Sequence, residues 1–96
     1  MAMRMDDHSM IMAFKALSDP TRITIIRLLQ GKELCANELR ASFNISQPTL
    51  SYHMRLLTDS NLVSCRKSGT YAYYRLNPEM WNCVAEAYAS LRPAEE

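Results

Sequence analysis

The hydrophobic period of the sequence changes abruptly at Leu62, and this change limits the folds open to the chain. Before it, apolar residues recur every three or four positions, as they do in helices with one buried face. After it, residues 62–67 and 70–76 are rich in tyrosine and β-branched residues around Ser68-Gly69, which predicts a β-hairpin with glycine in the turn. With 96 residues, helices and hairpin share one domain, residues 1–96.

Four helices are expected before the hairpin and one after it. Their predicted ranges are residues 7–17, 20–30, 36–43, 47–61 and 78–91. Asp19 and Ser46 are suitable N-cap residues, Pro20 suits a first helical position, and Gly31 suits the residue after a helix. Residues 1–7 are expected to form a frayed arm.

Two of these helices, residues 36–43 and 47–61, are separated by a turn at Asn44-Ile45, which is helix-turn-helix geometry. The hairpin that follows supplies a wing. The predicted fold class is therefore mainly α with a two-stranded β wing: a winged helix-turn-helix of four helices, two strands and a last helix. In such a fold the second helix of the motif enters the major groove of DNA.

The apolar stripe Leu50, Met54 and Leu57 turns the opposite face of the second motif helix outward. That face and the wing carry residue types that pair with base edges and phosphates. The predicted DNA-binding residues are Ser46, Gln47, Thr49, Ser51, Tyr52, His53, Arg55, Arg66, Lys67 and Ser68. Two alternatives stay open: the exposed face is only solvated, and His53 is a hydrogen-bonded residue at the edge of the core.

The net charge of +1 hides a segregated distribution. Residues 40–76 hold five basic residues against Asp59 alone, whereas residues 77–96 hold Arg92 against four glutamates. A basic middle segment beside an acidic tail is a pattern of nucleic-acid-binding proteins. The charge pattern therefore favours double-stranded DNA as a partner.

The last helix has an apolar arc wider than one side of a small core needs, which predicts a homodimer. The expected interface residues are Met10, Phe14, Met80, Trp81, Val84, Ala87, Tyr88 and Leu91. The alternative, from a different functional class, is a winged-helix protein-interaction module in which this arc docks another protein. A symmetric dimer favours the DNA-binding regulator over the module.

Other functional classes find little support. The chain has no Gly-rich phosphate loop, paired carboxylates or serine elbow, so an enzyme is not expected. It also lacks a long apolar stretch or a signal peptide, so we expect a cytoplasmic protein without a membrane partner. Three widely spaced cysteines make no disulfide framework. Cys35 and Cys65 are candidates for a thiol-based redox or electrophile sensor.

Four motifs together resemble the ArsR/SmtB family of bacterial transcriptional repressors over residues 10–92. They are residues 14–22 (FKALSDPTR), residues 33–39 (ELCANEL), residues 46–54 (SQPTLSYHM), and Gly69 followed by residues 73–76 (YYRL). The resemblance implies a homodimer built on the first and last helices. It further implies a palindromic operator from which an inducer releases the repressor.

The same resemblance argues against the familiar metal sites of the family. In arsenic- and cadmium-responsive members the third helix begins with a Glu-Leu-Cys-x-Cys run, but here Asn37 and Arg40 follow Cys35 where further cysteines are expected. One thiolate does not make the multi-thiolate site that soft metals favour. Residues 78–91 also lack the Asp and His ligands of the zinc-sensing type. We expect no metal and no cofactor, and the inducer stays open.

Overall fold

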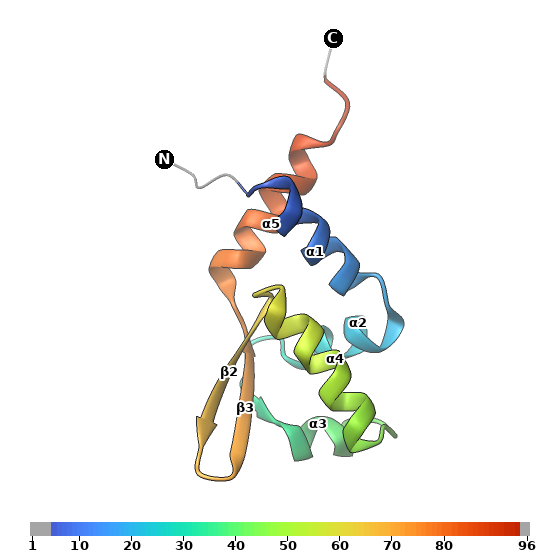
Figure 1. The fold of residues 1–96 in the computed structure, drawn as a ribbon, viewed down its shortest axis with the longest axis vertical. Helices are drawn as coiled ribbons and strands as arrows, with labels where there is room; N and C mark the ends of the chain where they lie inside the picture. The colour runs from blue at the N-terminus through green and yellow to red at the C-terminus, as the bar shows by residue number, and fades with distance from the viewer. Residues whose placement is uncertain (1–4, 95–96) are drawn as a thin grey trace.

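A computed structural model describes residues 5–94 as an elongated domain of helices with a small sheet (Figure 1). The elements are α1 (Asp7–Leu17), α2 (Pro20–Leu28), β1 (Leu34–Cys35), α3 (Ala36–Ser42), α4 (Gln47–Asp59), β2 (Val63–Ser68), β3 (Tyr71–Leu76) and α5 (Pro78–Ser90). The start of α1 and most of α5 form one end, and α3 and the hairpin tip form the other. The predicted winged helix-turn-helix is confirmed.

The helix boundaries follow the capping residues. The Asp19 carboxylate accepts a hydrogen bond from the backbone N–H of Arg22 at 3.1 Å, and Pro20 opens α2. Beyond the end of α2, Gly31 has the positive φ of 71° that glycine adopts readily. At α1, Asp6 is the N-cap and Met5 packs against the core, so these residues belong to the fold rather than to a frayed arm. Residues 1–4 of that arm lie outside the described residues.

The sheet has three strands in the order β1-β3-β2, one more than the sequence predicted. The hairpin pairs Ser68 with Tyr71 around Gly69, whose φ of 60° confirms its predicted role in the turn. On the other side of β3, Leu34 pairs with Tyr74. The strand β1 has only two residues, which is too short for a period to reveal it. This third strand ties the base of the wing to the start of α3.

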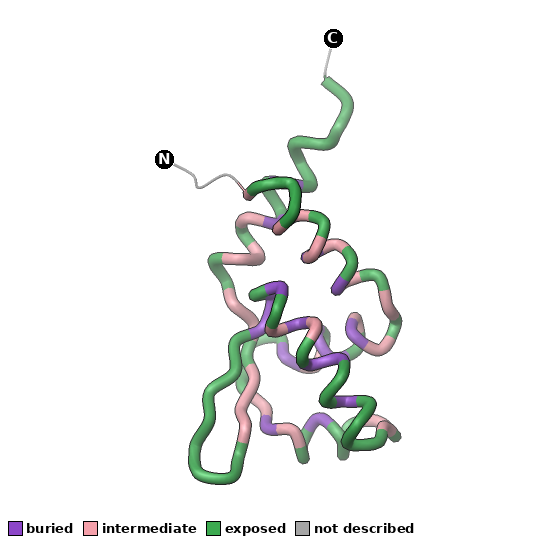
Figure 2. The backbone as a smooth tube through the Cα atoms, in the orientation of Figure 1, coloured by how far each residue is buried: buried purple, intermediate pink, exposed green. Residues whose placement is uncertain are grey.

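Helix α4 supplies the middle of the hydrophobic core. Its predicted stripe, Leu50, Met54 and Leu57, is almost fully buried. The other core residues come from α1, α2, α3, β2 and α5, so the purple segments in Figure 2 line the inner sides of these elements. On α2, the charged Arg22 is buried together with Ile25 and Ile26.

Replacing Leu57 by alanine should lower the free energy of unfolding by about 2–5 kcal/mol, because its side chain is fully buried and α4 cannot close the cavity alone. Chemical denaturation measures the change. Asp59→Ala, an exposed substitution in the last position of α4, serves as the control and should shift stability by less than about 0.5 kcal/mol. Equal losses in both variants would show that α4 is not packed on this stripe.

Candidate nucleic-acid interface

One face of α4 is exposed along its length and carries polar side chains. Gln47, Ser51 and Arg55 lie at intervals of four residues, so they form an exposed row along one side of α4, next to the buried stripe. Thr49 and Tyr52 are exposed as well. We call Gln47, Ser51 and Arg55 the reading row. Figure 2 shows exposed and buried segments along α4.

The N-terminus of α4 offers few free donors to a phosphate. The Ser46 hydroxyl caps the helix, accepting from the Thr49 N–H at 3.3 Å and donating to the Thr49 hydroxyl at 2.9 Å. Pro48 has no N–H, and the Leu50 N–H is bonded to the Ser46 carbonyl. In the first turn, therefore, the Gln47 N–H is the backbone donor left for an anion.

His53 does not belong to this exposed face, which corrects its prediction as a DNA-binding residue. Its exposed fraction is 8%, and its Nδ1 lies 3.0 Å from a guanidinium nitrogen of Arg22. The cause is its position beside Met54, at the line where α4 meets the corner between α1 and α2. His53 is therefore the hydrogen-bonded residue at the core edge that the sequence left as an alternative.

The wing presents Lys67 and Ser68 beside its turn, and both are exposed. Arg66 is exposed too, but its guanidinium donates to Glu33 at 2.7 Å and lies over the Tyr73 ring, 4.6 Å from the ring centroid. The hydrogen bond from Arg66 holds the pKa of the Glu33 carboxyl below its usual value. Glu33 thus offsets one positive charge of the basic segment, so Lys67 is the better placed phosphate contact.

The predicted dimer residues divide into two groups. Phe14, Met80, Trp81 and Val84 pack against the core of their own chain. The Trp81 indole N–H also donates to the backbone carbonyl of Leu62 at 3.0 Å. These four residues therefore stabilise the domain itself, and their part in a dimer interface stays a prediction.

The second group leaves apolar surface at the α1 and α5 end. Tyr88 and Leu91 are 67% and 61% exposed, and Ile11, which the sequence reading missed, is 48% exposed. Met10, Ala87 and Leu91 also line a cavity of about 400 Å³ between the two helices. The apolar end surface, defined here as Ile11, Tyr88 and Leu91, lies away from the hairpin tip and α3 (Figure 1).

The two candidate sensor cysteines are not neighbours. Cys35 is buried at the start of α3, where its backbone N–H donates to the Glu38 carboxylate at 2.9 Å, whereas Cys65 is exposed on β2. Cys35 pairs with Tyr73 and Cys65 with Tyr74. Because adjacent residues of a strand point to opposite faces, the two thiols lie on opposite sides of the sheet. A disulfide between them is therefore incompatible with this fold.

The described residues form no group of three side chains suited to hold a metal ion. A cavity of about 720 Å³ lies between the end of α2, β3 and the start of α5. Lys32, Arg75 and Trp81 line it together with apolar side chains. Across residues 5–94, no helix has the length and apolar character needed to cross a bilayer.

A polar row on the second motif helix, beside a wing with an exposed lysine, defines a winged-helix DNA-binding protein. Residues 19–64 match the family described as "Bacterial regulatory protein, arsR family". An arsenical resistance operon repressor from Staphylococcus xylosus is 52% identical over 70 residues, covering 73% of this chain and 67% of that protein. The transcriptional repressor SdpR of Bacillus subtilis is 42% identical over 64 residues, covering 67% and 71%.

The fold comparison agrees. A crystal structure of an ArsR family transcriptional regulator matches with a TM-score of 0.82 and 25% identity, covering 92% of this chain and 91% of the other. The chain therefore belongs to the ArsR family and is a DNA-binding transcriptional repressor. Family membership also confirms that it is not an enzyme.

Proposed function

We propose that the protein acts in the cytoplasm as a homodimer that represses transcription from a palindromic operator and leaves it when an inducer binds. The observation that carries this proposal is the reading row of α4, exposed beside a buried stripe of the same helix. In a symmetric dimer the two α4 helices would enter successive major grooves, about 34 Å apart on one side of the duplex.

The chemistry of the reading row supports sequence-specific binding. Glutamine pairs bidentately with adenine, arginine pairs with the acceptor edge of guanine, and serine bonds to either base edges or phosphates. Lys67 is exposed on the wing, and no described carboxylate lies within ion-pair distance of it. Such a lysine adds affinity for the backbone without reading the sequence. Gln47 and Arg55 should therefore set specificity, and Lys67 should set general affinity.

Replacing Gln47 or Arg55 by alanine should cost about 1–3 kcal/mol on the operator and little on unrelated DNA, since a base contact is lost. Lys67→Ala should weaken binding to both duplexes by a similar factor. It should also reduce the slope of log affinity against log salt concentration by about one. Fluorescence anisotropy with an operator and a scrambled duplex, across a salt series, measures both effects.

Two controls keep this comparison clear. Arg92→Ala removes an exposed positive charge beyond α5 and should leave both affinities unchanged. Circular dichroism confirms that each variant is folded. If Gln47→Ala and Arg55→Ala weaken operator and scrambled DNA equally, the reading row does not read bases.

The apolar end surface supports the homodimer. A domain of 96 residues has a modest core. The large apolar side chains of Ile11, Tyr88 and Leu91 are exposed to water. Because this surface lies away from the hairpin tip and α3, a second copy can cover it without blocking the reading row. The acidic residues Glu79 and Glu86 are exposed on α5.

Leu91→Glu should convert the dimer to a monomer at micromolar concentration, because it places a charge in the proposed contact, and operator affinity should fall with it. Sedimentation velocity measures the change in mass. Thr24→Glu, on the exposed side of α2, is the matched control and should stay dimeric. A wild-type chain that sediments as a monomer would contradict the proposal.

The inducer is proposed to be something other than a soft metal ion held by clustered thiolates. Cys35 stands alone at the start of α3, with Asn37 and Arg40 in the positions of further cysteines, and Cys65 points to the other side of the sheet. The arsenical repressors that this chain resembles are similar in sequence, but its residues do not fit a three-thiolate site. The cavity beside Trp81 offers room for a small organic inducer.

Stoichiometric arsenite should therefore fail to release the wild-type protein from its operator in an anisotropy titration. A variant combining Asn37→Cys with Arg40→Cys supplies thiols at the positions that the family resemblance assigns, and it should gain arsenite-dependent release. Arsenite release of the wild type at equal concentration would overturn this proposal.

A further inference from the structure

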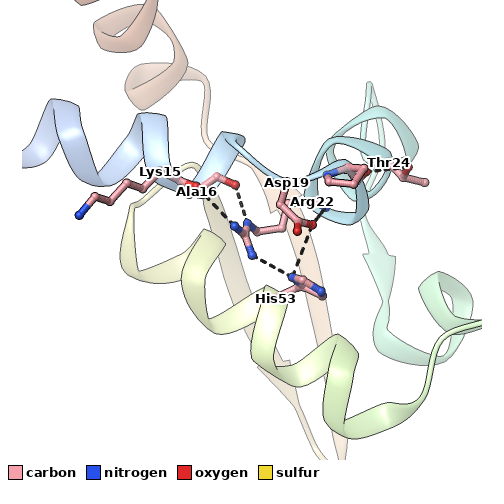
Figure 3. Close-up of polar contacts among 7 residues, drawn as sticks. Lys15, Ala16, Asp19, Arg22, Thr24 and His53 are labelled. Carbon is pink, nitrogen blue, oxygen red and sulfur yellow. Dashed lines mark hydrogen bonds and ion pairs between the residues drawn. The ribbon is translucent and has the colours of Figure 1, made fainter.

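Arg22 is a buried cation that connects three parts of the fold. Only 8% of its surface is exposed. Its Nε donates to the Ala16 carbonyl at 2.6 Å and a terminal nitrogen reaches the Lys15 carbonyl at 3.4 Å, both at the end of α1 (Figure 3). Its other terminal nitrogen lies 3.0 Å from Nδ1 of His53 on α4. Arg22 thus ties α4 to the corner where α1 meets α2.

This contact fixes the protonation state of His53. A guanidinium carries only donors, so the histidine nitrogen that faces it must accept. Nδ1 of His53 is therefore unprotonated in this geometry, and a neutral ring carries its proton on Nε2. A protonated imidazolium has donors at both nitrogens and cannot accept from Arg22.

The other groups around His53 determine which partner a protonated ring would have. The Asp19 carboxylate lies 3.9 Å from the same Nδ1, and Lys15 turns its ammonium group away from the ring (Figure 3). On α4 itself, Tyr52 meets the ring edge-on. Burial alone would raise the pKa of Asp19, but the backbone N–H and the guanidinium of Arg22 hold that pKa below its usual value. A carboxylate is therefore ready to pair with a protonated His53.

Protonation would exchange one contact for another. The bond from Arg22 to Nδ1 would be lost, and an ion pair with Asp19 would replace it. Arg22 is buried and would face a second cation, which is unfavourable in an environment of low dielectric constant. Because Ser51 and Arg55 lie two residues before and after His53, any shift of α4 at this point moves the reading row.

We propose that Arg22 and His53 are positioning residues that hold α4 in its DNA-reading orientation only while His53 is neutral. The proposal rests on the proposed function of the reading row. Histidine is the side chain type that changes charge between about pH 5 and pH 8, so acidification is the signal to which this contact responds. Protonating a histidine that touched DNA would instead strengthen binding, because it adds a positive charge near phosphates.

The chain makes a sharp test possible because it has only two histidines, His8 and His53. Operator affinity is measured by fluorescence anisotropy from about pH 7.5 to about pH 5.5 at constant ionic strength. The wild type should lose about tenfold in affinity across this range, the size expected for one hydrogen bond to a charged group. His8→Asn, on the exposed side of α1, should retain the same loss.

The decisive variant is His53→Asn. The asparagine amide oxygen can accept from Arg22 much as Nδ1 does, but it does not titrate. This variant should bind the operator within about threefold of the wild type at neutral pH and keep that affinity in acid. His53→Ala, which leaves the Arg22 donor unpaired, should bind about tenfold more weakly at both pH values. Circular dichroism at each pH verifies that the variants remain folded.

Acid that leaves wild-type affinity unchanged or increases it would overturn the proposal, as would an equal acid loss in His53→Asn. A further readout does not depend on DNA: nitrogen-15 NMR of the free protein should show the proton of His53 on Nε2 at neutral pH. A proton on Nδ1 would overturn the positioning role by itself. The wild type could also fail to bind the operator at neutral pH while NMR places the proton of His53 on Nε2. That result would count against the proposed function alone.

Discussion

The burial of one stripe of α4 is the constraint on which the rest of the structure depends. Leu50, Met54 and Leu57 lie among side chains from α1, α2, α3, β2 and α5, so α4 has one favourable rotation about its axis. That rotation leaves Gln47, Ser51 and Arg55 in solvent. The hydrophobic effect thus determines which side chains meet DNA, although none of the buried residues touches it.

Polar contacts over long sequence distances refine this arrangement. Arg22 bonds to His53 across 31 positions, Arg66 to Glu33 across 33, and Trp81 to the Leu62 carbonyl across 19. Each joins an element of the DNA-binding half to a neighbour: α4 to α2, the wing to the loop before β1, and α5 to the start of the hairpin. Such contacts limit how far the reading row and the wing move relative to the core.

The sequence predicted the helices and the hairpin well because capping residues and apolar periods act locally. Asp19, Ser46 and Gly69 have the roles that their chemistry indicates. The long-range contacts were beyond such reasoning. No local pattern indicates that Arg22 is buried against His53.

The candidate site also combines features that local sequence predicts with contacts between residues far apart in the sequence. The exposed row of α4 follows from periodicity, so its residues were predicted from Leu50, Met54 and Leu57. Arg66 and Trp81 contact partners that only the folded chain brings near, Glu33 and the Leu62 carbonyl, so these contacts could not be predicted from local patterns. The two-residue β1 is too short to show a period, and its partner β3 follows only after α3, α4 and β2 in the sequence.

The central claim is that the exposed face of α4 and the wing meet DNA while the α1 and α5 end does not. Titration of the nitrogen-15 labelled protein with its operator duplex tests it most directly, with amide chemical shifts as the readout. The account predicts large shifts over residues 46–52 and 66–69, and small ones over residues 84–91. Large shifts confined to α5, with α4 unmoved, would contradict it.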